Sequence, residues 1–213
     1  MKSKKLLNGF YNYTVVLTYI GMLFGLFGIV CAIEGNFRNT VIFLMCAGIC
    51  DMFDGAIAST RERNESEKRF GIQIDSLSDL ICFGVLPAMY VYMASERNKL
   101  TLVCGGLYVL CALIRLAYYN VCEEERQQQE DGSRKAFSGL PVTAAAIVYP
   151  LMFIIVKAFD LSGALILPTI AAVMAVAFVL TFKLKKPQLI GKLVLVAIGI
   201  SEFVILIGGF GIV

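Results

Sequence analysis

Apolar residues fill long stretches of this chain, and polar residues gather in the short segments between them. A helix of about 20 apolar residues is long enough to cross about 30 Å of hydrocarbon. Seven such stretches can be placed, at residues 12–33, 39–58, 72–94, 100–122, 141–158, 162–182 and 188–212. The pattern predicts an all-α, polytopic transmembrane helical bundle with about six to eight spans, seven being the best count, in a single domain over residues 1–213.

Basic residues are distributed unevenly between the two ends of these spans. With the N-terminus in the cytoplasm, 14 Lys and Arg side chains fall inside, 4 fall outside and Arg115 lies within a span. The inside group is Lys2, Lys4, Lys5, Arg61, Arg63, Lys68, Arg69, Arg126, Arg134, Lys135, Lys183, Lys185, Lys186 and Lys192, and the outside group is Arg38, Arg97, Lys99 and Lys157. This bias predicts a cytoplasmic N-terminus. The net charge of +3 is then a product of topology, and no nucleic-acid-binding patch is expected.

Composition narrows the possible chemistry. Hydrophobic residues make up 58% of the chain, charged residues 16%, and His is absent. All seven cysteines fall in predicted spans and none forms a CxxC pair, so we interpret them as apolar packing residues without disulfides.

Four aspartates stand where two predicted spans meet the inner face of the membrane. Asp51 and Asp54 are three residues apart, and Asp75 and Asp79 are four apart, so each pair shares one face of a helix. The two spans are consecutive and antiparallel, with a short cytoplasmic segment between them. The four carboxylates are therefore expected to converge in the cytoplasmic half of the membrane.

Converging carboxylates in a medium of low dielectric constant repel one another, and divalent cations remove that conflict. Oxygen ligands without His or paired Cys suit two hard ions such as Mg²⁺ or Mn²⁺. Two such ions can clamp a phosphoryl group, and one carboxylate can act as general base. A structural hydrogen-bonded role is the alternative for a single aspartate, and composition alone also permits an ion-coupled transporter.

The aspartates belong to a longer pattern. Asp51-x2-Asp54-Gly55-x2-Ala58 and then Gly71-x3-Asp75-x3-Asp79 resembles the signature of the CDP-alcohol phosphotransferase family, D-x2-D-G-x2-A-R-x(n)-G-x3-D-x3-D, at seven of its eight fixed positions. The chain departs from it at Ser59, where the signature has Arg, and in a gap to Gly71 a few residues longer than in many members. Arg61 and Arg63 are candidates to replace the missing charge.

The resemblance implies a role for each of these residues. Asp51, Asp54 and Asp75 would be the most secure ligands of two divalent cations, while Asp79 would be the general base and an additional metal contact. A CDP-lipid would lie against Asp54, Gly55, Ala58, Ser59, Arg61 and Gly71. The family also implies a homodimer among membrane lipids, and we expect a bacterial plasma membrane with the active site facing the cytoplasm.

Two further segments resemble the phosphatidylserine synthase branch of this family. They are FGIQIDSLSDLICFGVLPA, residues 70–88, and IRLAYYNV, residues 114–121, which is followed by FSGLPVT at 137–143. The resemblance implies that CDP-diacylglycerol and L-serine are the substrates and that phosphatidylserine and CMP are the products.

Serine carries a carboxylate, so its site needs a cation. Arg115 and Asn120 in the fourth span, and Arg134, Lys135 and Ser138 after it, are the candidates. Each has a plainer alternative: Arg115 can snorkel to the interface, Arg134 and Lys135 can be ordinary inside charges, and Ser138 can cap the fifth helix. Thr14 and Thr18 in the first span are expected to bond to their own helix backbone, and a role near the nucleotide is the less favoured alternative. Glu202, in the last span, has two open interpretations, a buried acid without an explanation or a residue that faces a dimer partner.

Two rival functions stay open at this point. Another family member would use a dianionic acceptor, glycerol 3-phosphate or an inositol phosphate, and would need a denser cluster of cations. An ion-coupled transporter would need the aspartates but not the spacing of Gly55, Ala58 and Gly71.

Overall fold

The computed structural model describes residues 9–129, 136–185 and 189–208. Four helical segments are long and apolar enough to cross a membrane, and three shorter apolar helices, Val142–Ala158, Gly163–Val179 and Leu193–Gly208, accompany them. The predicted class, a polytopic all-α membrane bundle, is confirmed, and each predicted span coincides with a helical segment. The helices are η1 (Tyr13–Val15), α1 (Val16–Ile33), α2 (Phe37–Ala58), α3 (Glu65–Asp79), η2 (Leu80–Val85), α4 (Leu86–Ala94), α5 (Lys99–Gln129), η3 (Val142–Ala144), α6 (Ala145–Ala158), α7 (Gly163–Val179) and α8 (Leu189–Gly208), and the strands are β1 (Ala136–Ser138) and β2 (Lys183–Lys185).

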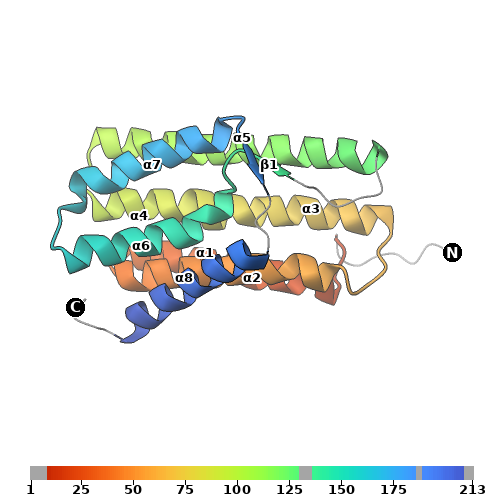
Figure 1. The fold of residues 1–213 in the computed structure, drawn as a ribbon, viewed down its shortest axis with the longest axis horizontal. Helices are drawn as coiled ribbons and strands as arrows, with labels where there is room; N and C mark the ends of the chain where they lie inside the picture. Colours follow the sequence, from red (N-terminus) through yellow and green to blue (C-terminus); the bar gives the residue numbers. More distant parts are fainter. Residues whose placement is uncertain (1–8, 130–135, 186–188, 209–213) are drawn as a thin grey trace.

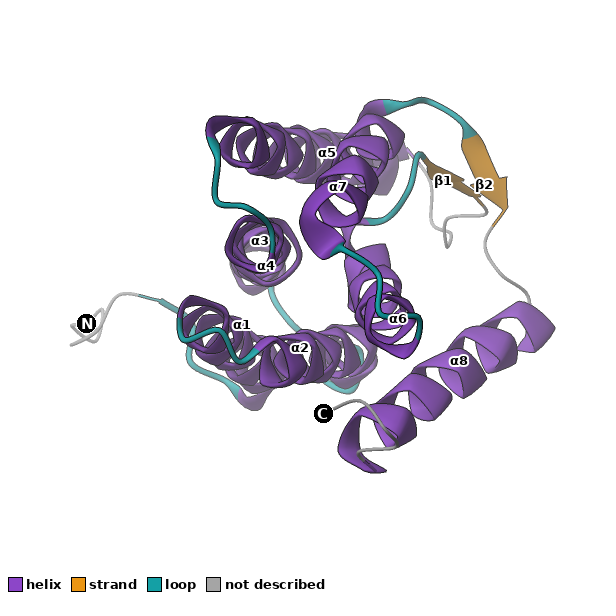
Figure 2. Ribbon diagram, turned by 90° about the vertical axis from the view of Figure 1, so that its left-hand side faces the viewer, coloured by secondary structure: helices purple, strands orange, loops and turns teal. Residues whose placement is uncertain are grey.

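Most helices run roughly along one common direction (Figure 1), whereas α8 runs obliquely to them (Figure 2). Seen end-on, α1 and α2 form a pair on one side, α5 and α7 lie on the other, and α3 and α4 follow one another between them (Figure 2). Helix α6 packs on α2, and α8 lies outside the bundle against α2 and α6. Both aspartate-bearing helices, α2 and α3, therefore contact α1 in the interior of this arrangement.

Helices α3 and α4 are joined without a break by η2, a π-helical segment. The Phe83 carbonyl within it accepts a hydrogen bond of 2.9 Å from the buried hydroxyl of Tyr108 on α5. The helix also begins earlier than the predicted span, at Glu65 rather than residue 72. A capping box explains the early start, because the Asn64 side chain accepts from the Glu67 N–H while the Glu67 carboxylate accepts from the Asn64 N–H.

Glycines let the helices approach closely around the aspartates. A Cβ atom at Gly25 of α1 would lie 2.7 Å from Cys82 Sγ, and one at Gly48 of α2 would lie 2.6 Å from the Cβ of Ala146 on α6. Both distances are shorter than ordinary contacts, so a side chain at either position would force its neighbours to shift. Small residues at such crossings are the usual means of close packing between membrane helices.

The two strands pair antiparallel, with Ser138 opposite Lys183. After β1 the chain turns at Gly139, whose φ of +74° favours glycine, and a Cβ there would lie 2.8 Å from the Leu180 carbonyl oxygen. The Leu140 N–H then donates to the Ala177 carbonyl at 3.2 Å. The GLP segment is thereby held against the end of α7.

Helix α8 is attached to the bundle through polar contacts as well as apolar ones. Arg38 on α2 donates to the carbonyls of Leu206 at 2.6 Å and Ile207 at 2.9 Å, at the end of α8. Glu202 on the same helix is 2% exposed, and neither of its carboxylate oxygens has a hydrogen-bond partner among the described residues. Nothing in the described part of the chain explains this buried acid. All seven cysteines are free, as predicted.

Candidate active site

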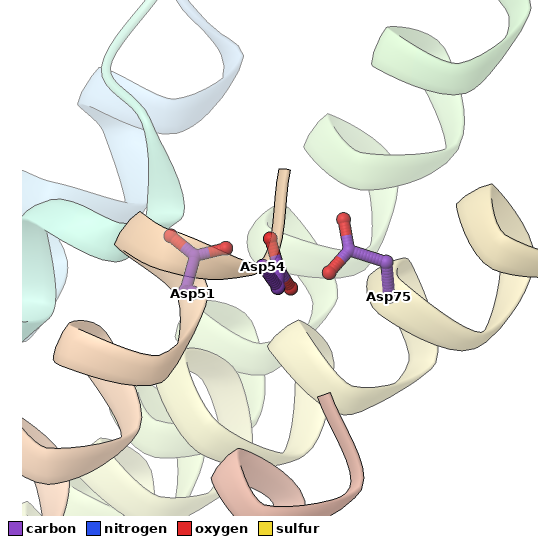
Figure 3. A group of neighbouring side chains, drawn as sticks. All are labelled: Asp51, Asp54 and Asp75. Carbon is purple, nitrogen blue, oxygen red and sulfur yellow. The ribbon is translucent and has the colours of Figure 1, made fainter. Parts of the chain in front are cut away.

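Three of the four predicted aspartates form a compact group. Asp51 and Asp54 project from α2 and Asp75 projects from α3, with their carboxylates directed toward one another (Figure 3). One oxygen from each lies within 4.8 Å of the others. Hard divalent cations hold their oxygen ligands at about 2.0–2.6 Å, so one small ion can contact all three carboxylates. The predicted convergence of the α2 and α3 pairs is confirmed for these residues.

The hydrogen bonding of the group fits a cation. Asp75 Oδ1 is buried and has no hydrogen-bond partner among the described residues. A buried carboxylate oxygen without a donor is costly, and a bound cation removes that cost. Asp54 Oδ2 accepts a hydrogen bond of 3.3 Å from Thr18 Oγ1 on α1. The expectation that the Thr18 hydroxyl bonds to its own helix was therefore wrong, because α1 packs close enough for the hydroxyl to reach a carboxylate.

Asp79 lies beside this group and not within it. It joins Asp51, Asp54 and Asp75 in lining a small cavity of about 10 Å³, together with Thr18, Ser78 and Cys82. A space of about 10–15 Å³ holds one water molecule. Asp79 thus lines the same cavity as the other three aspartates, but its carboxylate is not part of the three-carboxylate group.

A larger pocket opens next to the cluster. Its volume is about 170 Å³, below the roughly 300 Å³ of a pocket that encloses a whole drug-sized ligand. It therefore suits a headgroup fragment and not an entire lipid. Its walls come from α1, α2, α3 and the segments beside them: Thr14, Val15, Thr18, Asp54, Gly55, Ala58, Arg63, Gly71, Ile72 and Asp75.

The small signature residues take the predicted place in this pocket, whereas two polar candidates do not. Gly55, Ala58 and Gly71 line it, but Ser59 and Arg61 are absent from its described lining. The exposed Ser59 donates its hydroxyl back to the Ala56 carbonyl at 2.7 Å. Arg61 forms an ion pair of 3.6 Å with Glu67 at the start of α3.

The predicted serine-binding residues are not gathered at the aspartates. Arg115 is 6% exposed, donates from Nε to the Leu140 carbonyl at 3.2 Å and lies 5.5 Å from the Tyr119 ring centroid. The snorkelling alternative is therefore wrong, since the GLP segment supplies a buried acceptor. Asn120 accepts from the Ser76 hydroxyl at 3.0 Å, which links α5 to α3. Neither residue is among the described lining of the two pockets.

The remaining serine candidates follow α5. Arg134 and Lys135 lie outside the described residues, and Ser138 ends β1, where its backbone pairs with Lys183.

Four polar residues that line the two pockets were not assigned to the site from the sequence: Thr14, Thr18 and Arg63, which were considered only as alternatives, and Ser78, which was not considered. The threonines and the serine are ordinary helix residues in the sequence, so only the packing of α1 on α2 and α3 reveals them. Arg63 had been a candidate only as a replacement for the signature charge. No local pattern distinguishes it from Arg61, two residues earlier.

The fold and the site together define a class. The chain is an integral-membrane helical bundle with a carboxylate cluster beside a headgroup-sized pocket, an arrangement suited to binding cations and phosphates. The profile of the CDP-alcohol phosphatidyltransferase family matches residues 11–183, which span η1 to the start of β2. The protein belongs to this family, and the predicted assignment to a phosphotransferase is confirmed.

Curated relatives agree on the serine branch. An archaetidylserine synthase of Methanothermobacter thermautotrophicus is 30% identical over 82% of this chain and 71% of its own length. CDP-diacylglycerol–serine O-phosphatidyltransferases of Mycobacterium bovis and Helicobacter pylori are 31% and 29% identical over 62% and 68% of this chain. The chain covers only 45% and 58% of the lengths of these last two proteins.

Proposed function

We propose that this protein transfers a phosphatidyl group from CDP-diacylglycerol to the hydroxyl of L-serine, giving phosphatidylserine and CMP. The observation that carries the proposal is the group formed by Asp51, Asp54 and Asp75 beside a pocket lined by Gly55, Ala58 and Gly71. The names of the relatives support the acceptor, since they differ in the lipid part and agree on serine.

The carboxylate cluster is the proposed cation site. Asp51, Asp54 and Asp75 would hold two divalent cations, Mg²⁺ or Mn²⁺, with Asp79 as an additional contact. When bound, the cations would neutralise the pyrophosphate and the departing CMP. Thr18 holds the Asp54 carboxylate through its hydroxyl and so orients one ligand. The pocket beside Gly55, Ala58 and Gly71 would receive the nucleotide headgroup, while the lipid tails extend into the bilayer.

Asp79 is the proposed general base. Its carboxylate would take the proton from the serine hydroxyl, and the serine oxygen would form a bond to the phosphorus that carries the diacylglycerol. The bond from that phosphorus to the oxygen shared with the CMP phosphate would break, and CMP would leave with the bonding electron pair. The chain has no His, so a carboxylate in the small cavity is the available base.

The proposed serine-binding residues are those expected from the sequence. Arg115 and Asn120 stand on α5, while Arg134, Lys135 and Ser138 stand in the segment after it. We further propose that the protein works as a homodimer in a bacterial plasma membrane, with the aspartate site facing the cytoplasm. The bias of 14 inside against 4 outside basic residues supports this orientation.

The test is CMP release by the purified protein in detergent. CDP-diacylglycerol is supplied with Mg²⁺ or Mn²⁺, and serine, glycerol 3-phosphate or inositol 1-phosphate is added one at a time. We expect release only with serine and only with metal. Release with another acceptor alone would replace serine in the proposal, and no release by folded protein with any acceptor would favour the ion-coupled transporter.

A further inference from the structure

Arg63 reaches into the headgroup-sized pocket from the segment between α2 and α3. It lines the pocket together with Asp54, Gly55 and Asp75. Its guanidinium lies directly over Gly71, where a Cβ atom would stand 3.1 Å from one terminal nitrogen. Gly71 is one helical turn before Asp75, so the guanidinium sits close to the carboxylate cluster along α3.

Arg63 has no charge partner among the described residues. Among the described residues that line the pocket it is the one cation, and the described part of the chain supplies it with no ion pair or hydrogen bond. Arg61 differs, because Glu67 engages it at 3.6 Å while the other Glu67 oxygen accepts the Asn64 N–H. Capping of α3 thus holds Arg61 at the helix start and leaves Arg63 to face the pocket.

We propose that Arg63 binds the phosphate of the CDP-lipid that leaves with CMP, replacing the cation that the family signature places at the position of Ser59. The inference rests on the proposed function and adds a substrate-binding residue to it. Ser59 cannot serve, since its hydroxyl is turned back to Ala56. A guanidinium presents a planar fork of donors that matches the oxygens of a phosphate. The pocket then offers one phosphate both a cationic side chain and cations held by the aspartates.

Gly71 acquires a specific role in this arrangement. The guanidinium lies 3.1 Å from the position of a Cβ, so a side chain at residue 71 would push it aside. The absence of a side chain thus leaves room for Arg63 as well as for the ligand. The two residues are expected to behave as a coupled pair.

The first experiment compares Arg63→Ala, Arg63→Lys and the matched control Arg61→Ala. The KM for CDP-diacylglycerol, the KM for serine and inhibition by CMP are measured for each. For Arg63→Ala we expect the KM for CDP-diacylglycerol and the CMP inhibition constant to rise about tenfold or more, with the KM for serine within about twofold. Lys should recover part of the loss, and Arg61→Ala should stay within about twofold throughout. Equal effects of both alanine variants, or a rise confined to the KM for serine, would overturn the inference.

A second experiment uses Gly71→Ala in the parent protein and in Arg63→Ala. The added methyl should weaken CMP inhibition severalfold in the parent and have little further effect once Arg63 is truncated. Independent, multiplying effects of the two changes would mean that residue 71 acts on the nucleotide directly, contrary to its role in positioning Arg63.

Calorimetry with CMP and Mn²⁺ in the absence of serine separates this inference from the proposed reaction. If the protein binds CMP but transfers nothing to serine, the acceptor is wrong, and weaker binding by Arg63→Ala still supports the residue. Equal binding by the parent and Arg63→Ala removes Arg63 from the site. Absence of CMP binding by the folded parent protein overturns both proposals.

Discussion

Asp79 follows Asp75 by one turn of α3 and lines the small cavity without joining the three-carboxylate group. Replacing it by Asn keeps the size of the side chain and removes its ability to take a proton. We expect Asp79→Asn to lower turnover by about 10²-fold or more, the usual range for a general base, while binding of CDP-diacylglycerol stays within a few fold. Single-turnover CMP release and an equilibrium binding assay measure the two effects.

Asp51→Asn is the contrasting variant, because it removes a ligand from the three-carboxylate group. It should raise the Mn²⁺ concentration needed for half-maximal activity, whereas Asp79→Asn should change that concentration much less. Full turnover by Asp79→Asn would exclude it as the base. An unchanged metal titration for Asp51→Asn would contradict its assignment as a ligand.

The sequence predicts a site residue when its position follows from helical periodicity alone. Asp51, Asp54 and Asp75 could be placed together because spacings of three and four residues define a face and the connecting segment is short. Thr18 and Arg63 could not be placed this way. Thr18 reaches Asp54 only because α1 packs closely, and Arg63 is distinguished from Arg61 only by the capping of α3.

Arg115 shows a different limit at the same scale. One of its partners is the Leu140 carbonyl, which is 25 residues away and follows the turn at Gly139. The residues next to Arg115 in the sequence do not reveal such a distant partner. Snorkelling therefore stayed an alternative in the prediction.

Among the elements, α2 depends on a close crossing with α6. A Cβ atom added at Gly48 would lie 2.6 Å from the Cβ of Ala146. Gly48→Ala should therefore force the helices apart and destabilise the fold by about 1–3 kcal/mol, as overpacking does. The swap Gly48→Ala with Ala146→Gly returns one methyl to the crossing and should recover most of the loss. The variants are heated in detergent, and the fraction that stays folded is measured by size-exclusion chromatography. The unfolding temperatures of the variants and the parent are then compared.

Ala146→Gly alone is the control for this swap. It should cost up to about 1 kcal/mol, because glycine lowers helix propensity and a methyl group is lost from the interface. The close approach would not be a constraint if Gly48→Ala were as stable as the parent. The same would follow if the double variant were no more stable than Gly48→Ala.

The elements also show which boundaries hydropathy can find. The predicted span 39–58 and helix α2 end at the same residue, because polar Ser59 and Thr60 follow a stretch whose residues, apart from Asp51 and Asp54, are mostly apolar. The start of α3 was missed by seven residues, since Glu65–Phe70 form a polar helix outside any hydropathy window. The π-helical turn of η2 was not predicted either, because its register depends on packing against α5 through Tyr108.

At the scale of the whole molecule, the aspartate cluster lies toward the end of the bundle where α2 gives way to α3. Asp51 stands seven residues before the last residue of α2, a rise of about 10 Å. The proposed reaction requires this carboxylate to lie at the level of the lipid headgroups, where the pyrophosphate is. The C-terminal ends of α5 and α7, at Gln129 and Val179, border segments that are predicted to lie inside. The predicted inside segments together carry most of the basic residues. The charge asymmetry of the sequence supports the proposal that this end of the bundle faces the cytoplasm.

This orientation can be tested with two exposed acids at opposite ends of the bundle. Glu62 lies between α2 and α3, and Glu96 lies between α4 and α5. In a variant whose seven cysteines are replaced and whose activity is checked, Glu62→Cys and Glu96→Cys are treated separately with a membrane-impermeant maleimide. We expect Glu96→Cys to react in intact cells and Glu62→Cys to react only in inverted vesicles, since positive segments stay in the cytoplasm. Permeabilised cells should label both and serve as the control. Labelling of Glu62→Cys in intact cells would turn the aspartate site outward, and the enzyme would then have to draw its CDP-lipid from the outer leaflet.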